Sequence, residues 1–523
     1  MDLIARRSLL IGGGSLALAG YAGGVWAAPA FSSTPFTLGV AAGDPAADGF
    51  VIWTRLAPRP LDEHGGMPPL GVVVRWEVSE DARFARIARS GEALARPELA
   101  HSVHVEVGGL QPSRPYWYRF QVQGADASPV GRARTAPRAG DLPARLRLAS
   151  AGCQHYQAGL FTAWRHLSGE ADLDAVFHYG DYIYEGGTPV NPPQIVVAAG
   201  APIDRRHVGG EIYSLDDYRR RYAQYKTDPD LQAAHAAAAF IVSFDDHEVD
   251  NNWASDFDQD GTPPELFVLR RMGAMQAWYE HMPVRRAQFP HGGRAAMFRR
   301  LDYGRLLRMH VLDTRSYRSD QLCEYAGQTA CRPHDDPQST MLGAQQEAWL
   351  AAGLRNSAGW NLIAQQVFVM PTQRRRPDGS LERGGSDTWN GYPAARARLV
   401  KAIGDAGLSN VVVATGDAHI HAVGSIPLRD DEPDGPAAAV EFLATSISSG
   451  GDGAAETEGT RALLAGSPNL RLVNAQRGYQ LFDVSPTEWT TQVKVVDRVQ
   501  SPSGSLSTLG RFSVRPHRSE LYG

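Results

Sequence analysis

Four apolar, strand-like runs of this chain end directly in polar clusters, and this pattern constrains the fold more than any other feature of the sequence. The clusters are Gly152-Cys153, Gly180-Asp181, Asp245-Asp246-His247-Glu248 and Gly416-Asp417-Ala418-His419. Over residues 145–500, strand-like runs alternate with helix-like stretches, which is typical of layered α/β domains whose sheets are flanked by helices. Sites in open α/β sheets assemble beyond the carboxyl ends of the strands. We therefore expect the four clusters to lie together at one edge of such a domain.

The segment that precedes this domain has a different pattern. Residues 36–136 contain short strand-like runs separated by Gly, Pro, Asp and Ser, without helical periodicity. Alternation over 101–107 and 116–122 suits half-buried antiparallel strands. We predict a small all-β sandwich of the immunoglobulin or fibronectin type over 36–136. Residues 501–523 are rich in Ser, Gly and Arg, show no clear amphipathic helix, and are predicted to form a C-terminal tail.

The N-terminal residues have the pattern of an export signal. Arg6-Arg7 precedes the apolar, Gly-rich run 11–26, and small residues at 28–30 offer a cleavage site of the A-x-A type. A transmembrane anchor is the alternative, but the run is short for a span and is interrupted by six glycines. We predict a twin-arginine signal peptide over 1–30, the twin-arginine export machinery as a partner, a periplasmic or secreted location, and no integral membrane span in the mature chain.

The charge balance limits the partners of the chain. The formal net charge is −5 and the pI is near 6.4, so nothing supports a stable nucleic-acid partner, which usually requires a basic excess. A phosphate-bearing substrate would have to be attracted locally, by metal ions or by a few basic groups.

The three cysteines form a pair and a single residue. Cys323 and Cys331 lie in one polar loop, and in an oxidising compartment we predict a small-loop disulfide between them, with two free thiols as the alternative. Cys153 is left unpaired. A buried apolar cysteine is one interpretation, and a thiolate beside a di- or trivalent cation is the other.

Three carboxylates and an imidazole have the chemistry of a metal centre. Asp181 stands at a strand end, where a carboxylate can bridge two cations; an N-cap or turn aspartate is the alternative. Asp417 and His419 share a face only in extended chain, so the pair suits a strand-end loop and could hold two adjacent metals. Asp246 belongs to a dense acidic group, which is favourable only when cations neutralise it. We therefore expect Asp181, Asp246, Asp417 and His419 to be ligands.

Three further residues near these candidate ligands are considered: His247, Tyr184 and His421. His247 is placed to contact a phosphate or to protonate a leaving oxygen. Tyr184 follows Asp181 by three residues, and the spacing is equally compatible with a packed tyrosine and with a phenolate that ligates a strongly Lewis-acidic ion. His421 is expected to support the ligands from outside the centre.

Taken in chain order, the motifs Gly-Cys, Gly-Asp-x-x-Tyr, Asp-Asp-His-Glu and Gly-Asp-x-His resemble those of the PhoD-type alkaline phosphatases, distant relatives of the purple acid phosphatases. The stretches Leu312-Asp-Thr-Arg315-Ser-Tyr317 and Asp387-Thr-Trp389-Asn-Gly-Tyr392 fit the same family. The resemblance covers nearly all of residues 36–500, including the N-terminal β-sandwich. It implies Fe³⁺ held by Cys153, Asp181, Tyr184 and His419. It also implies Ca²⁺ held by Asp181, Asp246 and Asp417, with Asn251 or Asn252 as further ligands. His155 is left outside the metal set.

The same resemblance implies the function. It indicates an exported alkaline phosphatase that hydrolyses phosphate monoesters, and also diesters, with a metal-activated hydroxide or oxo nucleophile, with Asp181 and His247 as the catalytic residues. A phosphodiesterase or phospholipase D of the same fold is the first alternative, because the same metals serve either reaction and pocket shape decides. A non-catalytic surface binding protein is the remote alternative, but it leaves six candidate ligands in four clusters unexplained.

Overall fold

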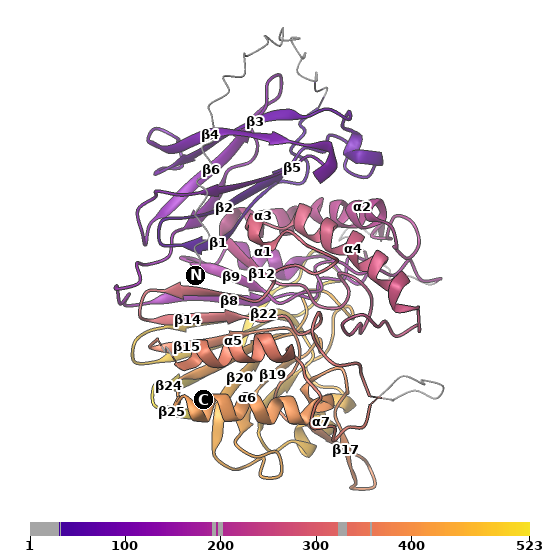
Figure 1. Cartoon of the computed structure of the whole chain (residues 1–523), viewed down its shortest axis with the longest axis vertical. Helices are drawn as coiled ribbons and strands as arrows, with labels where there is room; N and C mark the ends of the chain where they lie inside the picture. Colours follow the sequence, from indigo (N-terminus) through magenta and orange to yellow (C-terminus); the bar gives the residue numbers. More distant parts are fainter. Residues whose placement is uncertain (1–30, 32, 191–194, 197–201, 323–331, 356–357) are drawn as a thin grey trace, which may run out of the picture.

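The computed structural model of the chain describes residues 31, 33–190, 195–196, 202–322, 332–355 and 358–523 (Figure 1). The predicted signal peptide over 1–30 and the predicted pairing of Cys323 with Cys331 lie outside the described residues. Among the residues that are described, no helix is both long enough and apolar enough to cross a membrane.

Two large sheets form the body of the molecule. The ten-stranded sheet has the order β25 (Arg518–Tyr522), β24 (Leu506–Arg515), β23 (Trp489–Val496), β22 (Arg477–Val484), β8 (Leu146–Ala151), β9 (Ala175–His178), β12 (Ala239–Val242), β1 (Val40–Ala46), β2 (Gly49–Arg55) and β5 (Ser102–Val107). The seven-stranded sheet has the order β13 (Arg299–Tyr303), β14 (Leu307–Val311), β15 (Trp360–Ala364), β18 (Val411–Thr415), β20 (Ala437–Leu443), β19 (His421–Pro427) and β21 (Leu470–Asn474).

The sheets face each other, and helices cover their outer faces, as Figure 1 shows. Trp360 of one sheet packs against Trp489 of the other with ring centroids 5.9 Å apart, and Phe442 packs against Phe482 at 6.0 Å. Helices α1 to α4 cover the ten-stranded sheet, and α5 and α6 cover the seven-stranded sheet. The helices are α1 (Thr162–Ser168), α2 (Leu215–Lys226), α3 (Pro229–Ala237), α4 (Pro264–His281), α5 (Gly343–Arg355), α6 (Pro393–Asp405) and α7 (Glu458–Gly466).

The central strands of both sheets are parallel. β8, β9 and β12 pair in parallel in one sheet, as do β14, β15, β18 and β20 in the other. Their sequences are short, continuous apolar runs, such as the fully buried Val-Val-Val-Ala-Thr of β18, because a parallel strand inside a layered fold is covered on both faces. The layered α/β prediction is confirmed. Its consequence is that seven strands deliver the residues after their carboxyl ends to one side of the molecule.

The N-terminal region is all-β, as expected, but one of its two sheets is continuous with the ten-stranded sheet. The four-stranded antiparallel sheet has the order β4 (Ile87–Ala95), β3 (Val72–Ser79), β6 (Pro115–Gln121) and β7 (Gly131–Arg134). It packs against β1, β2 and β5, where Phe50 lies 6.4 Å from Tyr116 between ring centroids. β1 pairs in parallel with β12, with Ala42 opposite Ala239. The region is therefore joined to the rest of the chain by backbone pairing as well as by packing.

The C-terminal residues also belong to the ten-stranded sheet. Within residues 501–523, assigned above to a tail, β24 pairs with β23 and β25 pairs with β24. Phe512 and Val514 of β24 point into the core, while most of its other residues are partly or fully exposed. The tail is thus an edge of the sheet, and it contains no helix.

Candidate metal centre

The structure brings the candidate ligands together from both sheets. Cys153 follows β8, Asp181 follows β9, Asp246 follows β12, and Asp417 and His419 lie between β18 and β19. Potential ligand atoms lie within 4.8 Å of one another in three overlapping groups: Cys153 with Asp181 and His419, Asp181 with Asp246 and His247, and Asp245 with Asp246 and Asp417. Asp181 and Asp246 each belong to two groups. The three groups therefore form one continuous cluster, in which Asp181 and Asp246 are the shared residues.

The backbone at these strand ends is strained. Cys153, Asp181, Asp417 and His419 have φ of 51°, 54°, 67° and 55°, which is the left-handed region that residues with a Cβ usually avoid. Each such residue costs of order 1–3 kcal/mol, and such costs persist where the surroundings over-determine the geometry. The glycines before two of these residues are required, because a Cβ on Gly180 would lie 2.5 Å from the Asp245 Cβ, and one on Gly416 would lie 2.2 Å from the Tyr179 ring.

Glu248 connects the loop after β9, which carries Asp181, to the loop after β12, which carries Asp246. Its carboxylate accepts backbone N–H groups from Asp181 (3.1 Å), Tyr182 (2.7 Å) and Asp245 (2.8 Å). Burial raises the pKa of Glu248 to about 8, whereas these hydrogen bonds act in the opposite direction. All three partners are donors, so the arrangement accommodates the ionised form. Glu248 belongs to the motif Asp245-Asp246-His247-Glu248, but no role was predicted for it.

The Tyr184 hydroxyl lies among the candidate ligands. Its hydroxyl donates to Asp181 Oδ2 at 2.8 Å and lies 3.0 Å from His419 Nε2 and 2.7 Å from Ser449 Oγ. Burial, together with the charges of Asp181 and Cys153, raises the pKa of the phenol well above its usual value. A neighbouring cation would be needed to favour the phenolate.

The pKa values of the other two candidate ligands near Tyr184, Cys153 and His419, are shifted in opposite directions. Burial, with the charges of Asp181 and Asp417, raises the pKa of the Cys153 thiol, so this group also requires a cation to ionise. Burial lowers the pKa of His419 to about 3, which keeps its imidazole neutral, and a neutral imidazole is the form that ligates metals.

His247 is held over the Tyr184 ring by Glu185. Its Nδ1 lies 2.6 Å from Glu185 Oε2, and its ring centroid is 4.1 Å from that of Tyr184. Burial alone would lower the pKa of His247, but the carboxylates of Glu185, Asp246 and Asp181 raise it well above the usual value. These carboxylates therefore favour the protonated form of the imidazole.

A fully buried guanidinium stands among the carboxylates. Arg315, which follows β14, donates to Asp245 at 2.5 Å and to Asp387 at 2.8 Å, and its Nη2 lies 3.7 Å from both Asp246 Oδ1 and Asp417 Oδ1. It thus neutralises part of the negative charge and links carboxylates carried by different strands. Sequence reasoning did not assign a role to Arg315, Asp387, Glu185 or Ser449. Arg315 and Ser449 lie in polar segments that come after β14 and β20, so the strand-end pattern that located the other clusters also applies to these two.

The remaining candidates lie at the margin of the cluster. The side chain of Asn251 donates to Gln259 at 2.8 Å, while the backbone N–H of Asn252 donates to Asp246 Oδ2 at 2.8 Å. The imidazole of His421 contacts the backbone of Thr445 and Lys494, behind the centre. The His155 ring also contacts Tyr184, with centroids 4.4 Å apart and the ring planes tilted by 56°.

The donor set fits metal ions. The carboxylate oxygens Asp181 Oδ1, Asp245 Oδ2, Asp246 Oδ1 and Asp387 Oδ2 are buried without a hydrogen-bond partner. Such atoms are costly unless a cation compensates them. The mixed sulfur, nitrogen and oxygen donors near Cys153 suit a transition metal, and the carboxylates near Asp246 suit a hard divalent cation.

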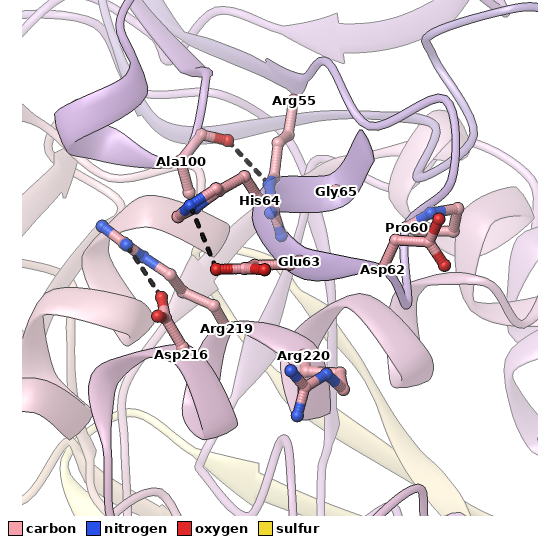
Figure 2. Close-up of a pocket in the computed structure, with 10 residues that line it drawn as sticks. All are labelled: Arg55, Pro60, Asp62, Glu63, His64, Gly65, Ala100, Asp216, Arg219 and Arg220. Carbon is pink, nitrogen blue, oxygen red and sulfur yellow. Dashed lines mark hydrogen bonds and ion pairs between the residues drawn. The ribbon is translucent and has the colours of Figure 1, made fainter. Parts of the chain in front are cut away.

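A cavity elsewhere in the molecule does not contribute to this centre. It has a volume of about 20 Å³ and lies between the short helix η1 (Glu63–Gly66) and α2, as Figure 2 shows. Arg219 pairs with Asp216 at 3.3 Å and Arg55 donates to the Ala100 carbonyl at 2.8 Å, so its charged groups already have partners. None of the candidate ligands lines it.

Two facing sheets flanked by helices, with carboxylates, imidazoles, a phenol and a thiol gathered at their strand ends, are the architecture of a metallophosphoesterase. Comparison with known proteins gives the particular family. Residues 148–493 match the PhoD-like phosphatase family, and residues 23–137 match the N-terminal domain of PhoD-like phosphatases. The chain therefore belongs to the PhoD-like phosphatase family and is a phosphoric ester hydrolase.

Individual relatives agree with this assignment. Alkaline phosphatase D of Bacillus subtilis (strain 168) is 42% identical over 496 residues, which cover 95% of this chain and 83% of the relative. The solved structure described as "Structure of PhoD" superposes with a TM-score of 0.88 at 42% identity, covering 95% of this chain and 93% of that chain. The similarity thus extends over both the N-terminal β-region and the catalytic sheets.

Proposed function

We propose that this chain is an exported, metal-dependent alkaline phosphatase that hydrolyses phosphate monoesters. The observation that carries the proposal is the position of Asp181, whose carboxylate belongs both to the group with Cys153 and His419 and to the group with Asp246 and His247. A carboxylate shared in this way suits two adjacent cations, which is the arrangement used for in-line displacement at phosphorus. The similarity to alkaline phosphatase D supports the same reaction.

The donor atoms support two kinds of cation. Cys153, Asp181, Tyr184 and His419 would hold Fe³⁺, and Asp181, Asp246 and Asp417 would hold Ca²⁺, with Asn251 and Asn252 beside them. When bound, these ions would supply positive charge for the phosphate oxygens and lower the pKa of a ligated water. The assignment of iron rests on the phenol and the thiol, because both have raised pKa values and need a strongly Lewis-acidic neighbour to ionise.

The protein's own groups would orient and protonate the substrate. His247, which is hydrogen-bonded to Glu185 and has its pKa raised by the nearby carboxylates, is placed to contact a phosphate oxygen or to donate a proton to the leaving oxygen. Asp181 would contribute a carboxylate that both groups of ligands share, the group with Cys153 and His419 and the group with Asp246 and His247. Arg315 would hold Asp245 of one sheet and Asp417 of the other close together, because its positive charge offsets part of the repulsion between the carboxylates.

Turnover of aryl phosphate monoesters and diesters, with and without chelator and with calcium restored, tests the proposal. We expect monoester turnover that chelation abolishes and calcium restores. Diester turnover far above monoester turnover would instead indicate a phosphodiesterase or phospholipase D. Full activity after verified metal removal would contradict the mechanism. A visible phenolate-to-iron charge-transfer band that Tyr184→Phe abolishes would support the iron site.

A further inference from the structure

Ser449 lies at the junction of three segments of the proposed metal centre. It stands on the loop after β20 of the seven-stranded sheet, whereas Cys153 and Tyr184 follow β8 and β9 of the ten-stranded sheet. Its hydroxyl donates to the Cys153 carbonyl at 2.7 Å, accepts the His155 N–H at 3.1 Å, and lies 2.7 Å from Tyr184 Oη. One hydroxyl therefore connects the loops that carry two candidate ligands across the gap between the sheets.

The loop that carries Ser449 is itself fixed. The Arg477 guanidinium donates to the Ser449 carbonyl at 2.5 Å and also contacts Ser446 Oγ and the Ala475 carbonyl. Ser449 is only 1% exposed, so it is not positioned to touch a substrate. A buried hydroxyl with three short contacts and a fixed backbone acts on the centre through the residues that it holds.

We propose that Ser449 is a positioning residue that holds Tyr184 and the Cys153 loop in the geometry required to bind a cation. The Ser449 hydroxyl donates its one proton to the Cys153 carbonyl, and its oxygen lies 2.7 Å from the Tyr184 oxygen, which in turn donates to Asp181 Oδ2. The same hydroxyl thus fixes the distance between the Cys153 loop and the Tyr184 side chain. The inference rests on the proposed function, because it assigns a role toward the proposed cation.

The position offers matched variants. Ser449→Ala removes the hydroxyl, Ser449→Thr retains it, and Ser449→Cys keeps the volume but weakens the hydrogen bonds. Ser448→Ala is the control: Ser448 is a neighbouring buried serine whose hydroxyl donates to the His155 carbonyl at 2.9 Å and contacts no candidate ligand. Comparison of these variants separates the effect of the Ser449 hydroxyl from that of a general disturbance of the loop.

The test uses the full chain loaded with Fe³⁺ and Ca²⁺. We would measure the intensity of the phenolate-to-iron band and the rate at which a chelator removes iron. Removing the hydroxyl leaves the Cys153 carbonyl without its donor and the Tyr184 hydroxyl without this contact, so Ser449→Ala should release iron about tenfold to a hundredfold faster and shift or weaken the band. Ser449→Thr and Ser448→Ala should resemble the wild type. If Ser449→Ala does not fold, Ser449→Cys should show the same change in smaller degree.

Wild-type behaviour of the Ser449→Ala band and release rate would overturn the inference while leaving the proposed function intact. Equal losses in Ser449→Ala and Ser448→Ala would also overturn it, since they would indicate a merely structural loop. A wild-type protein that binds no iron and works without metal would instead refute the proposed function, and the inference with it.

Discussion

Glu248→Gln should both destabilise the protein and inactivate it. The carboxylate accepts three backbone N–H groups, two on Oε2 and one on Oε1. A glutamine has only one acceptor oxygen, so its NH₂ group must face at least one of these donors. Above about pH 8, where Glu248 is ionised, the retained hydrogen bonds lose their charge assistance, about 1 kcal/mol each, and one buried N–H loses its acceptor, at about 1–3 kcal/mol. The expected loss of unfolding free energy is therefore about 3–5 kcal/mol.

The activity should fall as well, because the displaced N–H groups belong to Asp181 and Asp245. A displacement of about 1 Å at a reacting centre can reduce the rate about a hundredfold. Urea denaturation and aryl phosphate turnover measure the two effects. Glu441→Gln is the comparison variant: Glu441 is a fully buried carboxylate that accepts N–H groups from Val369 and Met370 and the hydroxyl of Thr415, but no backbone N–H of a candidate ligand. It should cost similar stability with a smaller loss of turnover. Unfolding free energy within about 1 kcal/mol of wild type, together with turnover within about threefold, would refute this reasoning.

Three further predictions concern other parts of the chain. Arg315→Lys should lower metal retention and turnover about tenfold or more, because a single ammonium group cannot contact Asp245 and Asp387 at the same time as the planar guanidinium does. Wild-type metal content and turnover in this variant would contradict the role given to Arg315. Lys226→Met should raise the melting temperature at pH 7, because Lys226 is buried over the Trp53 ring and burial lowers its pKa well below the usual value. Since the unfolded chain binds the proton that the folded chain lacks, this advantage should shrink as the pH rises toward 10, and a difference independent of pH would count against it. Replacing Arg6 and Arg7 with lysines should retain the protein in the cytoplasm, as judged by cell fractionation, whereas undiminished export would argue against the twin-arginine signal.

The convergence of ligands could be anticipated because it follows from a local pattern. Cys153, Asp181, Asp246 and Asp417 each follow a buried strand, and the carboxyl ends of neighbouring parallel strands must share an edge. The contacts among them could not be read in the same way. Ser449 and Arg477 reach the centre from distant segments, and no periodicity of the sequence relates them to Tyr184.

Strand pairing was the harder part of the fold to foresee. Alternation indicated the N-terminal strands, but not that β1 would pair with β12, because a parallel pair carries no turn that marks the partner. The strands of the predicted C-terminal tail were not foreseen, because β24 buries few side chains, with Phe512 and Val514 among many polar residues. β25 forms the edge of the sheet and β24 lies next to it, and strands that bury so few apolar side chains have a weak sequence signal.

The pairing of β1 with β12 also affects the order in which the chain can fold during synthesis. β1 leaves the ribosome long before Ala239–Val242 has been translated, so it must wait with one edge unpaired. Contacts of such large sequence separation form slowly, and bare strand edges promote aggregation in the meantime. Folding of the N-terminal region would therefore be completed only after most of the first half of the chain has emerged, and fragments that stop before β12 should accumulate as insoluble protein.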